Sequence, residues 1–168
     1  MKLNLGCGNK TKAGFIGVDR YHCAAAVLLA DLDGGLPFKS EVISEVLMDN
    51  VIEHVRSIPA LMQEIYRVCA DGAVVRIITP HFASLASWRD PTHIHHLSYF
   101  SMEHFEKKNV GHYTGGGFKV VARKLSFGGG MGLCGRLIHA VSPRAYESKW
   151  CFIFRPSTLR FKLEVAKE

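Results

Sequence analysis

Short apolar stretches separated by turns make up the first half of the chain, and this pattern is typical of strands. Residues Ala73–Thr79 form a nearly continuous β-branched run, which predicts a strand buried on both faces of a sheet. Four shorter stretches come before it and are also expected to contain strands: Lys2–Leu5, Phe15–Val18, Ala24–Leu32 and Glu45–Met48. The first half is therefore expected to supply the central strands of a sheet.

The segment Ser57–Val68 has the clearest helical period. Ser57 can cap the amino end of the helix, and Pro59 falls in the first turn, where its missing N–H does no harm. We therefore expect an amphipathic helix before the strand at Ala73. Its apolar positions are Ile58, Leu61, Met62, Ile65 and Val68.

The second half of the chain is less regular. Residues 81–98 are polar and rich in histidine, and Ser101–Lys108 is expected to form a short helix. Phe118–Phe127 and Trp150–Val165 predict two more strands, the second interrupted near Pro156, with the glycine-rich loop Gly128–Gly132 between them. Strands that alternate with helix-length connections favour a mainly parallel sheet, and the late pair favours an antiparallel edge. The prediction is one α/β domain over residues 1–168.

Composition narrows the class of protein. The chain has 168 residues, of which 48% are hydrophobic and 21% charged, as is ordinary for one globular domain. No apolar run reaches the roughly 20 residues needed to span a bilayer. The five cysteines are scattered, without a CxxC pair, so neither a disulfide framework nor a zinc knuckle is expected. A cytoplasmic protein without a membrane span is predicted.

The net charge of +6 is spread unevenly along the chain. Residues 1–100 carry nine Lys and Arg against ten Asp and Glu, whereas residues 101–168 carry twelve against five. Such a surplus can attract anionic small molecules, nucleic acid or a membrane surface, and it can equally be a solvated basic face.

Two glycines one residue apart, Gly6 and Gly8, follow the first strand. This spacing lets the backbone turn sharply and approach a ligand closely. In a doubly wound sheet such a turn lies at the carboxyl edge of the central strand, where ligands bind. Cys7, between them, is expected to be a small apolar filler.

Acidic residues mark the ends of the next two apolar stretches. Asp19 follows the second, and its carboxylate can accept two hydrogen bonds from the vicinal hydroxyls of a ribose. Asp31 and Leu32 close the third, where a carboxylate and a backbone N–H can bind an adenine edge. Together with the glycine turn, these residues indicate a nucleoside site.

The same residues argue against a nicotinamide dehydrogenase. That fingerprint needs a third glycine three residues after the second, and Thr11 stands there instead. The segment between Gly8 and Asp19 is also too short for a full crossover helix. No P-loop, GxSxG or HExxH motif is present either.

The ordered set of motifs resembles class I S-adenosylmethionine-dependent methyltransferases, in particular small type-11-like members with a shortened first helix. The resemblance implies a single Rossmann-like, doubly wound domain and S-adenosylmethionine as cofactor. It covers nearly the whole chain. The segments that carry it are Leu3–Gly8, Gly17–Asp19, Asp31–Leu32, Leu36–Phe38, Asn50–Val55, Asp90–His93 and the closing stretch from Phe152–Phe154 to Leu163–Val165.

The resemblance also implies roles for single residues. Gly6, Cys7 and Gly8 would pass under the methionine part of the cofactor, and Asp19 would hold the ribose hydroxyls. The remaining expected contacts are Arg20 beside the adenine, Asp31 and Leu32 on the adenine, and Asn50 and Val51 near the methionine and sulfonium.

Methyl transfer needs an acceptor in line with the methyl group, and a hydroxyl acceptor also benefits from a general base. His54, Asp90 and His93 are the predicted catalytic residues, and no metal ligand is assigned. An Asp–His pair can serve as a base with its orienting partner. His54 can instead be a capping or solvent-facing residue, and the histidines at 93, 95 and 96 can be structural or, with Asp90, bind a metal.

The predicted function is methyl transfer from S-adenosylmethionine to a small molecule, or to a sugar or polysaccharide precursor. A cofactor-binding module without turnover is one alternative. A nucleic-acid methyltransferase is a second alternative, which the surplus of Lys and Arg in residues 101–168 favours. The Asn/Asp-Pro-Pro-aromatic motif of base amino-group methylation is absent, however.

Overall fold

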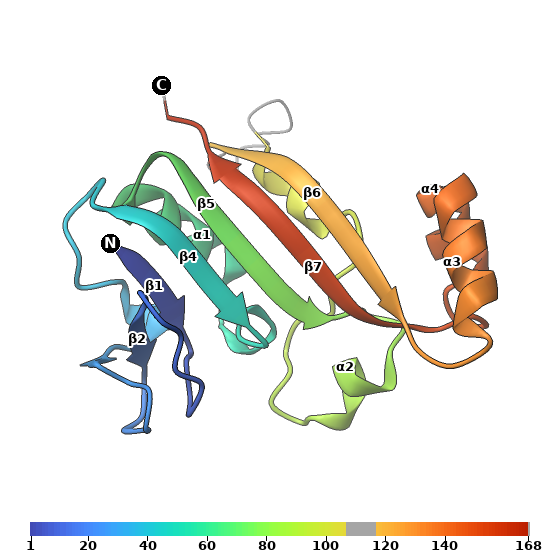
Figure 1. Ribbon diagram of the computed structural model, residues 1–168, viewed down its shortest axis with the longest axis horizontal. Coiled ribbons are helices and arrows are strands. Elements are labelled where there is room, and N and C mark those ends of the chain that lie inside the picture. The colour runs from blue at the N-terminus through green and yellow to red at the C-terminus, as the bar shows by residue number, and fades with distance from the viewer. Residues whose placement is uncertain (107–116, 168) are drawn as a thin grey trace.

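Seven strands form one mixed sheet in the computed structural model, which describes residues 1–106 and 117–167. Their order across the sheet is β3-β2-β1-β4-β5-β7-β6 (Figure 1). β1 to β5 run parallel, whereas β7 is antiparallel to β5 and β6. The strands are β1 (Lys2–Leu5), β2 (Ile16–Asp19), β3 (Leu28–Leu29), β4 (Ile43–Asp49), β5 (Cys69–Pro80), β6 (Phe118–Phe127) and β7 (Pro156–Val165).

The strand order confirms the expected doubly wound domain with an antiparallel edge. From β1 the chain moves outward through β2 to β3 and then returns to place β4 on the other side of β1. The order therefore reverses between β1 and β4. In open α/β sheets this switch point, at the carboxyl ends of the strands, is where ligands bind.

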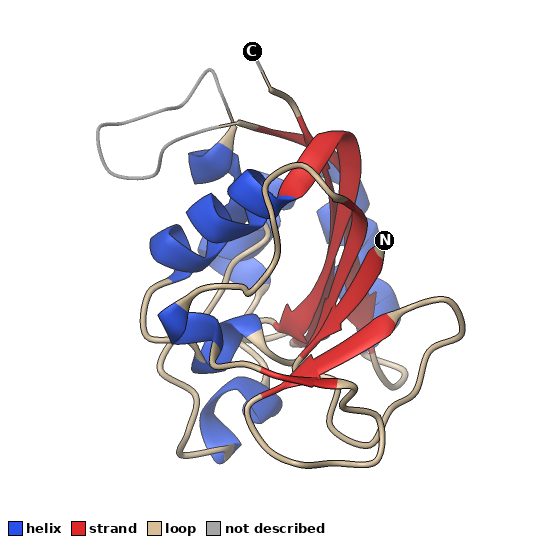
Figure 2. Ribbon diagram, turned by 90° about the vertical axis from the view of Figure 1, so that its left-hand side faces the viewer, coloured by secondary structure: helices blue, strands red, loops and turns tan. Residues whose placement is uncertain are grey.

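The helices are unevenly distributed over the sheet. Figure 2 shows most of them on one side of it. None in the described residues is long and apolar enough to cross a bilayer. The helical segments are η1 (Leu32–Gly34), η2 (Ile52–His54), α1 (Ile58–Val68), α2 (Leu85–Arg89), η3 (Ser101–Phe105), α3 (Gly132–Val141), α4 (Pro143–Ala145) and the π-helical turn η5 (Tyr146–Trp150).

Helix α1 confirms the helical prediction. The hydroxyl of Ser57 accepts a hydrogen bond from the backbone N–H of Ala60 (3.2 Å) and so caps the amino end. The apolar face of α1 packs on the sheet, and its buried residues are Leu61, Met62, Ile65 and Val68.

The prediction that the strand at Ala73–Thr79 is buried on both faces is wrong. Val75 and Ile77 are buried on the helix side, but Arg76 between them is exposed and pairs across the ladder with Lys162 of β7. Alternation along β5 thus leaves one face of the sheet charged. β5 also begins earlier than predicted, at Cys69, and includes an irregularity around Gly72.

Two predictions for the C-terminal region are also wrong. The strand expected over Trp150–Val165 begins only at Pro156, because Trp150 belongs to η5. Gly132, expected in a loop, begins helix α3. Gly132 and Gly135 are the buried residues of α3, and a Cβ at Gly135 would meet the Phe127 ring at 2.7 Å. The fully buried positions of this helix are therefore glycines, which disfavour a helix, and Ile138 and His139 are partly buried beside them.

Two smaller differences concern the third strand and the helix expected at Ser101–Lys108. β3 contains only Leu28 and Leu29 of the apolar stretch Ala24–Leu32. η3 is a 3₁₀ helix that ends at Phe105, and Lys107 and Lys108 lie outside the described residues.

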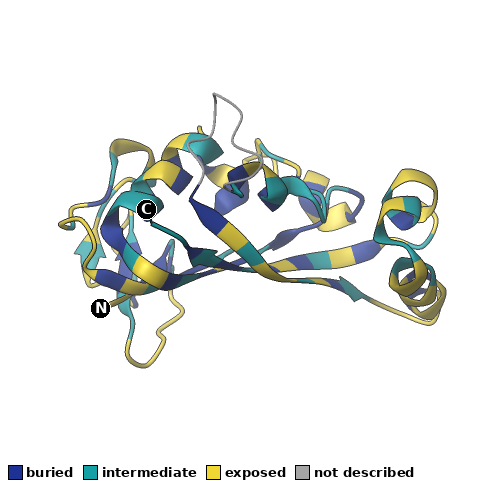
Figure 3. Cartoon of the chain, turned by 90° about the horizontal axis from the view of Figure 1, so that it is seen from above, coloured by how far each residue is buried: buried dark blue, intermediate teal, exposed yellow. Residues whose placement is uncertain are grey.

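Figure 3 shows α3 and α4 at the far end of the sheet from β1 and largely exposed.

Candidate active site

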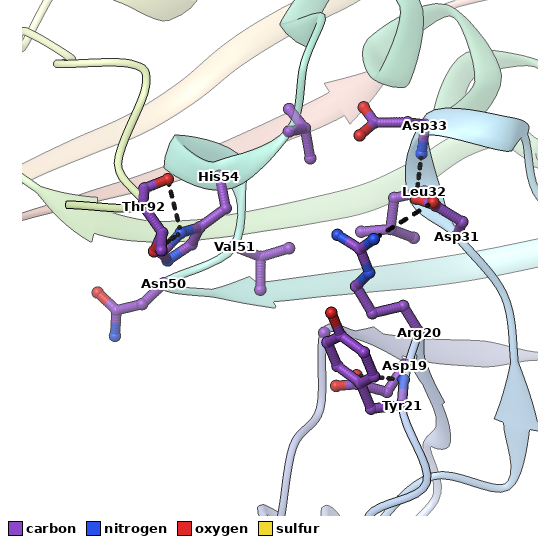
Figure 4. A pocket seen from close by; sticks show the side chains of 12 residues that line it. Asp19, Arg20, Tyr21, Asp31, Leu32, Asp33, Asn50, Val51, His54 and Thr92 are labelled. Carbon is purple, nitrogen blue, oxygen red and sulfur yellow. Dashed lines mark hydrogen bonds and ion pairs between the residues drawn. The ribbon is translucent and has the colours of Figure 1, made fainter. Parts of the chain in front are cut away.

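A cleft of about 390 Å³ lies at the carboxyl ends of β1, β2 and β4 (Figure 4). This is the switch point of the sheet. Arg20, Tyr21 and Asp31 lie at one end of it, His54 and Thr92 lie at the other, and Val51 lies between. The lining residues are Gly6, Asp19, Arg20, Tyr21, Asp31, Leu32, Asp33, Asn50, Val51, His54, Val55 and Thr92.

The glycine turn after β1 forms part of the cleft floor. Gly6 has φ +60°, which favours glycine, and a Cβ there would overlap the side chain of Val51. Cys7 is 3% exposed, and burial raises the pKa of its thiol to about 11. It is therefore an apolar filler, as expected, and does not line the cleft.

Backbone N–H groups hold both oxygens of the Asp19 carboxylate. Gly8 donates its N–H to Oδ2 (2.8 Å) and Tyr21 donates its N–H to Oδ1 (3.1 Å). Each carboxylate oxygen has a further lone pair, so Asp19 can still accept two hydrogen bonds from a ligand. Gly8 thus acts by fixing Asp19.

Asp31 lies at the same end of the cleft as Asp19 (Figure 4). Its Oδ1 accepts the N–H of Asp33 (3.1 Å) at the start of η1, and its Oδ2 lies 3.8 Å from the Arg20 guanidinium. The same guanidinium lies over the Tyr21 ring, 5.1 Å from its centroid. Asp31 and Arg20 are both about half exposed, so this end of the cleft is open to solvent.

A second cleft, of about 550 Å³, adjoins the first. Asn50 and His54 line both. Asn50 has φ +57°, an uncommon conformation for a residue with a side chain, which asparagine tolerates better than most. The second cleft is lined by Asn50, His54, Pro80, Ala86, Arg89, Asp90, Pro91 and His93.

His54, at the end of η2, is joined to Asp90 through Thr92. The Thr92 hydroxyl donates to Oδ1 of Asp90 (2.7 Å) and therefore accepts from Nδ1 of His54 (3.0 Å). The backbone carbonyl of Thr92 is a second acceptor for the same Nδ1 (3.3 Å). His54 thus carries its ring proton on Nδ1 and keeps a lone pair on Nε2. The hydrogen bonds from Thr92 lower the pKa of Asp90.

His93 is oriented in a similar way by a different element. Its Nδ1 donates to the backbone carbonyl of Ser87 in α2 (3.0 Å), so its lone pair is on Nε2. That Nε2 lies 4.0 Å from Oε1 of Glu53 and 3.9 Å from Oδ2 of Asp90. The His54 and His93 rings meet edge to face at 4.6 Å. Asp90 therefore orients His54, through Thr92, and does not lie behind His93.

Glu53 is a buried carboxylate that the sequence-based assignment missed. It is 1% exposed, and its Oε2 accepts a hydrogen bond from the Thr79 hydroxyl (3.0 Å), while Oε1 has no hydrogen-bond partner. Burial raises the pKa of the Glu53 carboxyl, and the hydrogen bond from Thr79 and the nearby imidazoles of His54 and His93 partly oppose this rise.

Known structures share this arrangement of strands. An S-adenosylmethionine-dependent methyltransferase from Mesorhizobium loti is 13% identical, with a TM-score of 0.62 over 97% of this chain and 89% of the other. A methyltransferase of the same kind from Archaeoglobus fulgidus is 17% identical, with a TM-score of 0.64 over 97% and 85%. The chain has the fold of the S-adenosylmethionine-dependent methyltransferases.

The comparisons extend no further than this methyltransferase fold. No protein-family model matches the sequence, and no curated protein matches it. The cyclase SpnF has the same fold, with a TM-score of 0.64 at 11% identity over 99% of this chain and 75% of the other. A reaction must therefore be argued from the residues of the clefts.

Within this methyltransferase fold, most of the predicted cofactor residues line the first cleft; Cys7 and Gly8 are the two that do not. Of the predicted catalytic residues, His54 lines both clefts, and Asp90 and His93 line the second. The predicted cofactor residues on the first cleft are Gly6, Asp19, Arg20, Asp31, Leu32, Asn50 and Val51.

The other histidines of the loop after α2 have structural contacts. His95 bonds through Nε2 to the carbonyl of Val55 (2.9 Å), and His96 stacks on Trp88 with ring centroids 3.6 Å apart. The surplus of Lys and Arg in residues 101–168 does not belong to the two clefts. None of the described residues of this segment lines either cleft.

Proposed function

We propose that the protein is a methyltransferase that binds S-adenosylmethionine in the first cleft and transfers its methyl group to a hydroxyl-bearing acceptor in the second. The observation that carries this proposal is the Asp19 carboxylate, which two backbone N–H groups hold at a strand end beside the Gly6 turn. A fixed carboxylate beside a close backbone approach suits a nucleoside with a small charged tail.

The residues of the first cleft fit the parts of the cofactor in order. Asp19 accepts the two ribose hydroxyls, with Arg20 beside the adenine and Asp31 and Leu32 on its edge. We call these residues, together with Gly6, the nucleoside end. In this proposal Gly6, Asn50 and Val51 contact the methionine and the sulfonium, and Cys7 and Gly8 support the turn and the Asp19 carboxylate.

Bound S-adenosylmethionine supplies a methyl group that is already activated, so alignment of the acceptor is the main task of the protein. We call Glu53, His54, Asp90, Thr92 and His93 the acceptor end. The Nε2 atoms of His54 and His93 both have free lone pairs there and can accept the proton of an acceptor hydroxyl. Asp90 positions His54 through Thr92.

A sugar-like small molecule, including a polysaccharide precursor, is the acceptor that we favour. The second cleft is open and polar, with Asn50, Arg89 and Asp90 among its lining residues, and such groups bind hydroxyl-rich ligands. We also propose a cytoplasmic location, because the five cysteines are scattered and present as free thiols.

Calorimetric titration of the purified protein with S-adenosylmethionine and S-adenosylhomocysteine tests the proposal. We expect saturable one-to-one binding, which Asp19→Ala weakens by about 100-fold because two charge-assisted hydrogen bonds are lost. The Asp71 carboxylate accepts the N–H of Lys167 outside both clefts, so Asp71→Asn is the matched control and should bind both ligands normally. Absence of binding of either ligand at millimolar concentration would refute the proposed function.

A further inference from the structure

Three potential metal-ligand atoms lie close together at the acceptor end. They are Oε1 of Glu53 and one ring nitrogen each of His54 and His93, and the three lie within 4.8 Å of one another. The Nδ1–H of His93 bonds to the Ser87 carbonyl, so its Nε2 lone pair faces Oε1 of Glu53 at 4.0 Å, and the Nδ1–H of His54 bonds to Thr92, which leaves the Nε2 lone pair of His54 free. Oε1 of Glu53 is buried and has no hydrogen-bond partner.

We propose that Glu53, His54 and His93 bind one divalent transition-metal ion. This proposal deepens the proposed function and rests on it for its role in methyl transfer, whereas the metal site itself stands on the geometry alone. Three lone pairs that lie this close repel one another unless a proton or a metal cation lies between them, and a metal ion can engage all three at once. Two neutral imidazoles and one carboxylate are a donor set suited to zinc, iron, cobalt or nickel.

The distances are close to those that an ion requires. Three atoms no more than 4.8 Å apart fit within a circle of radius about 2.8 Å, whereas ligand bonds to such ions are about 2.1 Å long. Each ligand atom would therefore move by less than about 1 Å. Asp90 lies beside this group, with its Oδ2 3.9 Å from Nε2 of His93.

Each ligand also has the outer partner that a metal site needs. Metal-binding histidines usually donate their other N–H to a carbonyl or carboxylate, which fixes the ring and its tautomer. Here Thr92 holds His54, the Ser87 carbonyl holds His93, and Thr79 holds Oε2 of Glu53. The backbone carbonyl of Glu53 further accepts the N–H groups of Ile94 and His95, which fixes the loop of His93 against η2.

A second group of potential ligands, Cys7, Asp19 and Cys23, differs on each of these points. Both oxygens of Asp19 already accept backbone N–H groups, so no orphaned carboxylate oxygen is present. Burial raises the pKa of Cys7 to about 11, which opposes the thiolate that a metal requires.

The position of the site gives the ion a task in the proposed reaction. His54 lines both clefts and His93 lines the second. An acceptor hydroxyl that binds the ion beside the sulfonium is held in place and made more acidic. The ion would then perform the task that the histidines perform as bases in its absence.

Titration of the chelator-treated full-length protein with cobalt(II), followed by the visible absorption of the bound ion, tests the proposal. We expect one equivalent to bind and zinc to displace it. Loss of a residue that only hydrogen-bonds to a metal ligand weakens metal binding by about 10- to 100-fold. His93→Ala and Glu53→Gln remove a ligand itself, so each should weaken cobalt binding by more than this. His96→Ala, in the same loop but stacked on Trp88, is the matched control and should bind cobalt like the parent protein.

Titration of the same variants with S-adenosylhomocysteine separates the two proposals. Normal nucleoside binding by Glu53→Gln and His93→Ala shows that they are folded, so their loss of cobalt reports on the site. A protein that binds cobalt in this way but no S-adenosylhomocysteine keeps the metal site and loses the proposed function. A parent protein that binds no cobalt, or variants that bind it as well as the parent, would overturn the metal site.

Discussion

The nucleoside end and the acceptor end of the active site are built in different ways. At the nucleoside end, residues that follow consecutive strands meet because parallel strands end at one edge of the sheet. At the acceptor end, Glu53 and His54 of η2 meet Asp90 and His93, about forty positions further along the chain. The first arrangement follows from the order of the strands, and the second depends on the packing of one loop.

The two ends also differ in how their polar atoms are satisfied. Both carboxylate oxygens of Asp19 are held by backbone N–H groups, so this residue is ready to accept a neutral hydroxyl-bearing ligand. Oε1 of Glu53, by contrast, has no partner and faces a histidine nitrogen. A buried acceptor without a donor is costly, and such groups often mark a functional site. The acceptor end is therefore the part that a ligand would complete.

Gly6→Ala should have the largest effect, because it changes the backbone on which the nucleoside end rests. The left-handed conformation costs a residue with a side chain about 1–2 kcal/mol, and overlap with Val51 adds a similar amount. We expect the free energy of unfolding to fall by about 3 kcal/mol, measured by denaturant titration.

Gly34→Ala is the matched control, because a Cβ there meets no atom within 4 Å, and it should change stability little. The double variant Gly6→Ala/Val51→Ala should recover the part of the loss that comes from overlap. If the loss of unfolding free energy in the double variant equals the sum of the losses in Gly6→Ala and Val51→Ala, the Val51 side chain does not exclude a side chain at Gly6.

Asp31→Ala should have an intermediate effect on the nucleoside end. The carboxylate is about half exposed and only loosely paired with Arg20, so solvent screens it more than Asp19. We expect S-adenosylhomocysteine to bind about 10-fold more weakly by calorimetry, against about 100-fold for Asp19→Ala. Asp31→Asn keeps an acceptor for the N–H of Asp33 and should fall between Asp31→Ala and the parent protein. Equal losses for Asp19→Ala and Asp31→Ala would contradict this ranking.

The sequence was sufficient to predict the elements whose patterns are local. Ser57–Val68 combines a cap with an apolar period, and Gly6 follows β1 and Asp19 ends β2, as expected. Helix α3 was missed although Leu133, Leu137 and Val141 follow a helical period, because it begins in a glycine-rich segment and glycine disfavours a helix. Those three residues are exposed, so an apolar period indicates a helix but not the face on which it packs.

The acceptor end could be predicted only in part. Residue type and position in the sequence indicated His54, Asp90 and His93. They could not show that Thr92 joins Asp90 to His54, or that His95 and His96 contact other residues. Glu53 gave no signal, because a glutamate beside a histidine is expected to be solvated. Its burial follows from contacts between η2, β5 and the loop after α2, which no local pattern records.

Thr92→Val should have the smallest effect on the nucleoside end and so tests whether the two ends are separate. The substitution keeps the shape of the side chain but removes the hydroxyl between Asp90 and His54. We expect affinity for S-adenosylhomocysteine to change by less than about two-fold, and cobalt affinity at the acceptor end to fall by about 10-fold.

The exposed residue Thr11, in the turn after β1, provides the control for Thr92→Val. Thr11→Val makes the same chemical change outside both clefts and should leave both affinities unchanged. If Thr92→Val weakens S-adenosylhomocysteine binding as much as cobalt binding, the loop after α2 contributes to both ends. Thr92 lines the first cleft, so in that case it would hold the cofactor in addition to orienting His54. The nucleoside end would then depend on tertiary packing, as the acceptor end does.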